Sequence, residues 1–124
     1  MLVVIDDTHH NSLLKRKNSG AWVIYTFGES STFQYIIVQS IGKTLQSLIQ
    51  SLPDDQCCYV VLNFESNKEI TTNKIVLVSY APDSAPVKDR LKTSFYLKDI
   101  KNTLDVRYLM QANCKDDIYG ITRF

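Results

Sequence analysis

Four apolar runs rich in β-branched and aromatic residues do most to constrain what this chain can fold into. They are residues 21–27 (AWVIYTF), 32–39 (TFQYIIVQ), 57–64 (CCYVVLNF) and 74–80 (KIVLVSY). Residues of these types favour β-strands. The short polar segment 28–31 (GESS) between the first two runs predicts a hairpin. The fourth run is apolar almost throughout, which is typical of a strand with neighbours on both sides.

Helical patterns separate or follow these runs. Residues 43–52 place four apolar side chains on one helical stripe, and Pro53 ends the pattern. The four are Leu45, Leu48, Ile49 and Leu52. Beyond a turn at 81–83, Pro86 suits the first turn of a helix, because the missing N–H of proline costs nothing there. Around 97–104 the pattern predicts a second helix or a kinked continuation of the first.

Weaker patterns complete the order of elements. A helix is expected within 6–17, a short strand at 106–110 and a short helix at 114–122. The resulting order, αββαββααβα, predicts one mixed β-sheet of five to six strands sandwiched by helices, an α/β fold of the α+β type. With 124 residues and no linker or repeat, the chain is expected to form a single domain, 1–124.

Composition argues against several broad classes. The net charge of +1 is unlike that of a general nucleic-acid binder, which carries a strong basic excess. No apolar run approaches the roughly 20 residues of a membrane span, and Asp6 follows the apolar start too soon for a secretory signal. Neighbouring residues on a strand face opposite ways, so Cys57 and Cys58 cannot both reach Cys114. We expect reduced thiols in a cytoplasmic protein.

No constellation for catalysis or metal binding is apparent. His9 and His10 are adjacent, and adjacent residues of a helix do not face one site. The acidic doublets at 54–55 and 116–117 suit turns and helix caps. The segment 42–44 (GKT) matches only the end of a phosphate-binding loop and lacks the upstream glycine. We expect no catalysis, no cofactor and no metal, and an enzyme is the least supported hypothesis.

A basic cluster follows Pro86. Lys88 and Lys92 are four residues apart and share one helix face, whereas Arg90 points elsewhere around the helix. Leu91 between them suits either the core or an exposed apolar anchor. The spacing alone fits an ordinary solvated face as well as it fits a docking surface for an acidic partner.

The segment 74–104 resembles the ADF/cofilin family, in which a central strand runs into a proline-rich turn and then into the long actin-binding helix. The turn is 81–86 (APDSAP). A second resemblance is the family's L-P-x-x-x-C-x-Y pattern, here residues 52–59 (LPDDQCCY). Weaker ones are 111–113 (QAN) and the basic residues ahead of Trp22. Together the resemblance covers about residues 5–119.

The resemblance implies an ADF-homology, gelsolin-like fold and a cytoplasmic protein that binds actin. The implied partners are actin monomers, preferably ADP-bound, and more weakly filaments, with promotion of depolymerisation and no stable homo-oligomer. The resemblance implies that the surface that binds actin monomers contains Lys88, Arg90, Leu91, Ser84, Val87 and Val4. Leu91 replaces the methionine that is usual there. Lys74 and Arg123 fall on the weaker filament-binding surface.

The chain also departs from the family pattern. Its first serine is Ser12, so the usual N-terminal phosphorylation switch is absent at that place. The family's Y-A-S-S-K-D run, expected after the helix, is replaced by 93–98 (TSFYLK). Gly120 and Ile121 stand at charged positions of the terminal helix. Monomer binding is therefore expected to be better retained than filament binding, and severing to be weak.

Two further hypotheses stay open. The domain keeps the fold but binds another partner, such as an actin-related protein. As a side hypothesis, Lys88, Arg90 and Lys92 together bind acidic phosphoinositide headgroups.

Overall fold

The computed structural model describes residues 2–4, 21–28, 34–66, 72–104, 106 and 108–119. The helix expected within 6–17 lies outside the described residues. In chain order the elements are β1 (Leu2–Val4), β2 (Trp22–Phe27), β3 (Gln34–Gly42), α2 (Leu45–Ser51), β4 (Cys58–Ser66), β5 (Thr72–Tyr80), α3 (Val87–Leu104), β6 (Tyr108–Ala112) and α4 (Lys115–Tyr119).

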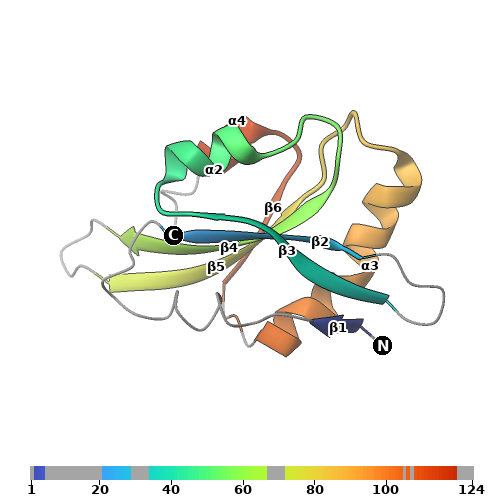
Figure 1. Ribbon diagram of the computed structural model, residues 1–124, viewed down its shortest axis with the longest axis horizontal. Coiled ribbons are helices and arrows are strands. Elements are labelled where there is room, and N and C mark those ends of the chain that lie inside the picture. The colour runs from blue at the N-terminus through green and yellow to red at the C-terminus, as the bar shows by residue number, and fades with distance from the viewer. Residues whose placement is uncertain are drawn as a thin grey trace.

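The strands form one six-stranded mixed sheet in the order β1-β3-β2-β4-β5-β6 (Figure 1). The central pairs are antiparallel, whereas β1 runs parallel to β3 and β6 runs parallel to β5. The predicted mixed sheet is therefore confirmed. The predicted hairpin is confirmed as β2 and β3, and the apolar β5 lies between β4 and β6 as expected.

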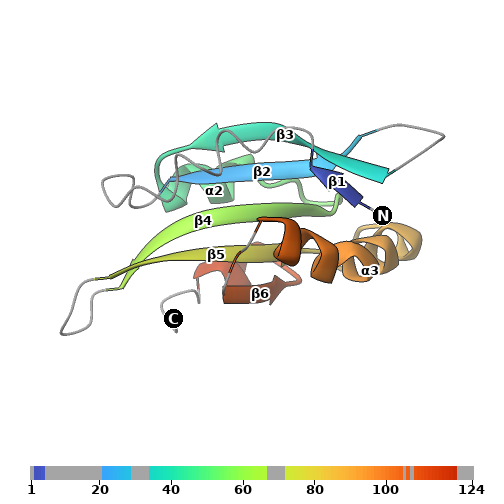
Figure 2. The ribbon, with the colours of Figure 1, turned by 90° about the horizontal axis from the view of Figure 1, so that it is seen from below.

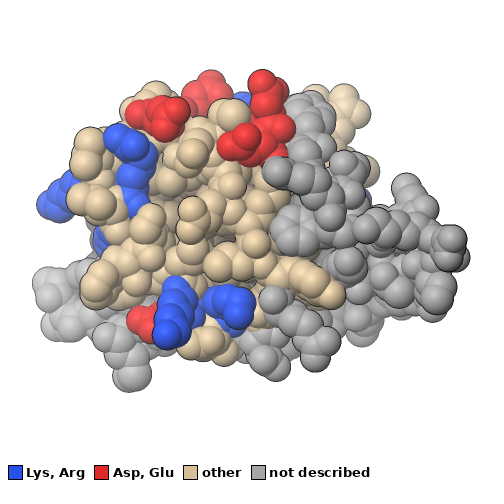
Figure 3. Space-filling view, turned by 180° about the vertical axis from the view of Figure 1, so that it is seen from behind, with Lys and Arg blue, Asp and Glu red and all other residues tan. Residues whose placement is uncertain are grey.

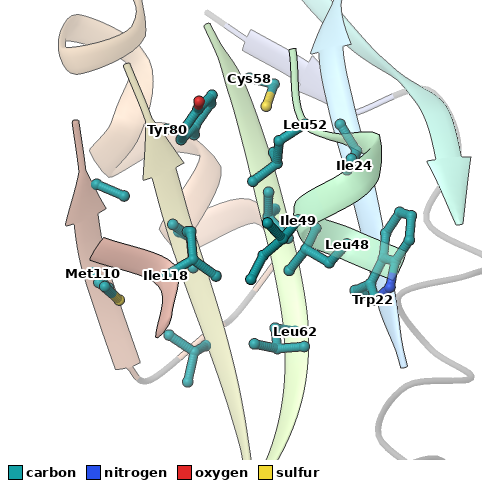
Figure 4. Close-up of a cluster of buried hydrophobic side chains, with 14 residues drawn as sticks. Trp22, Ile24, Leu48, Ile49, Leu52, Cys58, Leu62, Tyr80, Met110 and Ile118 are labelled. Atoms are coloured by element: carbon teal, nitrogen blue, oxygen red, sulfur yellow. The ribbon is translucent and has the colours of Figure 1, made fainter. Parts of the chain in front are cut away.

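Helices cover both faces of the sheet. In Figures 1 and 2, α2 and α4 lie on one side of the strands and α3 lies on the other. Alternation along β2 supplies both cores: Trp22 and Ile24 join the cluster under α2 and α4, and Val23 and Tyr25 join the cluster under α3. Figure 4 shows Leu48 and Ile49 of α2 and Ile118 of α4 packed on the sheet face that α2 and α4 cover.

The helix after Pro86 is a single element, and not the two pieces or the kinked pair that the sequence suggested. Its buried residues are Thr93, Leu97, Ile100 and Leu104. Their spacing keeps one face on the sheet without a break, and no glycine or proline interrupts residues 87–104. The 93–98 run expected after the helix therefore lies within it.

Smaller differences concern the bounds of strands and one additional strand. β3 continues to Gly42, β4 runs from Cys58 to Ser66 and β5 begins at Thr72, each one to three residues from the expected bounds. β6 runs from Tyr108 to Ala112, two residues later than expected at both ends. Val106 is buried, and its N–H donates to the carbonyl of Lys101 at the end of α3, so it closes the helix instead of joining the sheet. β1 was not predicted, because its three residues pair with a strand about thirty positions away and carry no periodic signal of their own.

The three cysteines are free, as expected: Cys57 is half-buried, Cys58 is buried and Cys114 is exposed. Within the part of the chain that the structure describes, no helix is long and apolar enough to cross a membrane.

Gly42 is required by the close approach of β3 to an indole ring. A Cβ at this position would lie 2.2 Å from Cζ2 of Trp22. The indole cannot easily move, because its Nε1 donates to the carbonyl of Thr44 at 2.8 Å and to the hydroxyl of Ser47 at 3.1 Å. The ring is also 2 % exposed, so it is fixed by the core around it.

We predict that Gly42→Ala lowers the free energy of unfolding by about 1–3 kcal/mol, because overpacking a fixed ring forces strain. Urea unfolding measures the effect. Lys43→Ala, at the exposed next position, is the control and should change stability by less than about 0.5 kcal/mol. Equal stabilities of Gly42→Ala and the wild type would contradict the close contact.

Burial also makes stability depend on alkaline pH. Burial of the Cys58 thiol raises its pKa to about 12, and burial of Tyr80 raises its pKa to about 12. The unfolded chain releases these protons at lower pH than the folded chain does. Stability is therefore full below the ordinary cysteine pKa of 9.0 and falls as pH rises from there toward 12.

We predict that Cys58→Ala reduces this slope between pH 9 and 10.5 by up to about 1.4 kcal/mol per pH unit, the contribution of one proton. The measurement is urea unfolding at several pH values under reducing conditions. Cys114→Ala, at the exposed site, should leave the slope as it is. A slope unchanged by Cys58→Ala would rule out this source of alkaline sensitivity.

Candidate functional site

The start of α3 is held by the turn that precedes it. The N–H of Ala85 donates to the carbonyl of Pro82, and the N–H groups of Asp89 and Arg90 donate to the carbonyl of Pro86 at 3.0 and 3.1 Å. Pro86 thus stands directly before Val87, the first helical residue, and its carbonyl accepts the first hydrogen bonds of the helix. The predicted proline-marked corner is confirmed.

Polar contacts link this corner to neighbouring loops. The hydroxyl of Ser84 donates to the backbone carbonyl of Asp54, and the carboxylate of Asp54 pairs with Lys115 at 3.0 Å. The same loops border a depression of about 430 Å³, lined by Tyr80, Ser84, Cys114, Lys115 and three aspartates, among others. Within the described ranges, no three His, Cys, Asp or Glu side chains are grouped to hold a metal ion.

The inner face of α3 is fixed on the sheet by one buried polar contact within an apolar interface. The hydroxyl of Tyr59 on β4 donates to the backbone carbonyl of Thr93 at 2.6 Å, and both residues are almost fully buried. The hydroxyl of Thr93 donates to the carbonyl of Asp89 one turn earlier. The Tyr59 bond and the buried side chains of Leu97, Ile100 and Leu104 together hold this face of the helix on the sheet, which leaves the opposite face exposed.

The outer face of α3 carries apolar side chains. Val87 is 61 % exposed, Leu91 is 66 % exposed and Phe95 is 75 % exposed. The two sequence-based alternatives for Leu91 are thus decided: it is exposed and not part of the core. Phe95 was missed, although its spacing of four and eight residues from the other two is visible in the sequence.

The three cations of the cluster do not converge. Lys88 is exposed, whereas Arg90 is half-buried and donates from Nε to the carbonyl of Ala85 at 3.3 Å. Lys92 is half-buried, with Nζ 4.3 Å from the centre of the Phe27 ring, a cation–π geometry. Lys88 and Arg90 lie about 200° apart around the helix axis, at 100° per residue.

Neither Lys88 nor Arg90 pairs with an acid of the described part of the chain; the ion pair found there joins Lys115 to Asp54. In Figure 3 the basic side chains of the displayed face fall into separate groups with uncharged surface between them; acidic side chains gather along the top, and one more lies beside the lower basic group. The helix therefore presents cations beside apolar surface instead of one dense basic patch.

The remaining predicted site residues lie elsewhere. Val4 is on β1, at one sheet edge, and β1 contacts α3, so the chain start and the helix do lie side by side. Lys74 is on β5, six residues before its end at Tyr80, which places its backbone roughly 20 Å along the strand from the turn into α3. Arg123, Gly120 and Ile121 lie outside the described residues.

Comparison with known proteins identifies the family of the chain. Residues 6–119 match the family model described as cofilin/tropomyosin-type actin-binding protein. Cofilin of Schizosaccharomyces pombe is 30% identical over 79 residues, which cover 63% of this chain and 58% of that protein. Actin-depolymerizing factor 3 of Arabidopsis thaliana is 30% identical over 97 residues, which cover 74% of this chain and 68% of that protein.

Solved structures match at lower identity and bear on the fold alone. The crystal structure of Streptomyces griseoflavus cofilin superposes with a TM-score of 0.80 at 19% identity, over 99% of this chain and 94% of that chain. Human coactosin-like protein superposes with a TM-score of 0.79 at 15% identity, over 99% of this chain and 95% of that chain. The resemblance is confirmed by the family match over most of its length, and the chain belongs to the cofilin/ADF family of actin-binding proteins.

Proposed function

We propose that this chain binds actin monomers through the first half of α3, binds filaments more weakly and promotes filament depolymerisation. The observation that carries the proposal is the outward face of that half-helix. It sets the exposed cation Lys88 beside the exposed apolar side chains of Val87 and Leu91. An exposed apolar row with cations beside it is typical of a surface that a partner covers.

The two kinds of side chain have different roles in this docking. Leu91 and Val87 supply apolar area, which favours binding when a cleft on actin removes it from water. Lys88 and Arg90 supply positive charge, which raises the association rate and fixes the register on an acidic rim. Arg90 approaches from one edge of the helix, because its Nε bond to Ala85 holds it there.

Ser84 lies in the turn before α3, and Val4 lies on β1, which contacts α3. The hydroxyl of Ser84 is engaged with the carbonyl of Asp54, so we propose that Ser84 positions the corner before α3 as much as it contacts actin. The packing of β1 against α3 supports a contribution from the chain start near Val4.

A separate surface would serve filaments. Lys74 lies at the far end of β5 from the turn into α3, so one actin subunit docked on α3 would leave it for a second subunit. The lost charges at Gly120 and Ile121 would weaken that second contact, which is why we propose weak filament binding and weak severing. The proposed protein is a single-domain, monomeric, cytoplasmic module.

Phosphoinositide binding by Lys88, Arg90 and Lys92 as one group gains no support from the geometry. Lys92 is held over Phe27 and Arg90 is held at the opposite edge of the helix, so the three would not surround one headgroup.

The test is monomer binding by the double variant Lys88→Ala with Arg90→Ala. We expect the dissociation constant for actin monomers to rise roughly 10- to 100-fold, because two charged contacts are lost. Thermal stability should change little, since Lys88 is exposed and Arg90 has one weak backbone contact. The charge-matched control is Lys43→Ala with Lys101→Ala, which should bind like the wild type.

Two outcomes would refute the proposal. A double variant that binds as tightly as the wild type would remove α3 from the interface. A wild-type chain that neither binds monomers nor cosediments with filaments would leave the alternative, a family member whose partner is an actin-related protein.

A further inference from the structure

Phe95 is the most exposed of the large hydrophobic side chains in the described part of the chain, at 75 %. It is the third member of a row with Val87 and Leu91 at intervals of four residues, and each step turns only about 40° around the axis. The row spans about 12 Å, because eight residues rise 1.5 Å each. It lies opposite the buried face formed by Thr93 and Leu97.

The Phe95 ring is oriented by a series of aromatic contacts that begins in the core. Phe27 packs edge-on against Tyr59, with ring centres 5.7 Å apart, and against Tyr96 at the same distance. Tyr96 in turn packs against Phe95 at 4.9 Å and 87°. A ring that is already oriented loses little conformational entropy on binding, which makes it a good anchor.

Cations flank this apolar row. At 100° per residue, Lys88 falls about 20° from Phe95 near the start of the row, whereas Lys98 and the exposed acid Asp99 follow within one turn after Phe95. Both lysines are exposed. The complementary surface is therefore an apolar recess with an acidic group near Lys88, at the start of the row.

A second copy of this chain fits that description poorly. Two copies paired in parallel through the row would bring Lys88 of each against Lys88 of the other, and like charges oppose such pairing. The row is also a single helix face of three large side chains, whereas a stable dimer needs about 800 Å² from each partner.

We propose that Phe95 is a third apolar anchor of the actin-docking face and strengthens the binding of actin monomers. The inference rests on the proposed function and extends its site by one helical turn. In the Y-A-S-S-K-D run of the family pattern, the position of Phe95 is a serine. A protein with that serine would present a smaller, polar side chain to the same place on actin. The phenyl ring adds affinity only where actin offers an apolar recess at that turn.

The experiment compares Phe95→Ser and Phe95→Leu with the wild type by titration against labelled actin monomers. We expect Phe95→Ser to weaken monomer binding about tenfold and Phe95→Leu to weaken it less than about threefold, because leucine keeps most of the apolar area. The matched control is Ile37→Thr, which changes an apolar side chain of 38 % exposure on β3 and should not alter binding. Thermal unfolding of each variant verifies that the fold is intact.

The outcomes separate this inference from the proposed function. If Phe95→Ser binds actin monomers as tightly as the wild type does, or more tightly, Phe95 is not an anchor, although actin remains the partner. If the wild type without actin sediments as a dimer and Phe95→Ser sediments as a monomer, a second copy of the chain and not actin occupies the row. Absence of any wild-type actin binding defeats the proposed function itself.

Discussion

The outward face of this molecule depends on one buried hydrogen bond, from the hydroxyl of Tyr59 to the carbonyl of Thr93. It lies inside an interface that is otherwise apolar, where an unpaired polar group would be costly. The bond joins β4 to one turn of α3, and together with the buried side chains of Leu97, Ile100 and Leu104 it favours one rotation of the helix. That rotation leaves Lys88, Leu91 and Phe95 exposed.

Much of the fold was predictable because the signals are local. Continuous β-branched runs marked β2 to β5, and the stripe from Leu45 to Leu52 marked α2, since each pattern reports the burial of its own residues. β1 was not predictable in the same way: three residues become a strand only by pairing with β3. That α3 is one helix was missed because Leu97 and Leu104 suggested a separate periodic segment. In the structure these two residues pack on the same sheet as the earlier part of the helix.

The candidate site was predicted only in part, because the sequence shows the spacing of residues along a helix but not their contacts with distant segments. Helical spacing placed Lys88 and Lys92 on one side and Arg90 on another. It did not reveal that Lys92 is drawn to Phe27, a residue of a distant strand, or that Leu91 is exposed. Spacing orders residues around a helix, but only the packed sheet decides which side is the inside.

The parallel pairing of β5 with β6 makes α3 the crossover that joins two neighbouring strands of the sheet. Its inner side chains and its length are tied to folding, because a shorter or tilted helix would misplace the last strand. Its outer side chains carry no such burden. Substitutions along that outer surface, at positions such as Leu91 and Phe95, can therefore change what the domain binds while the architecture stays the same.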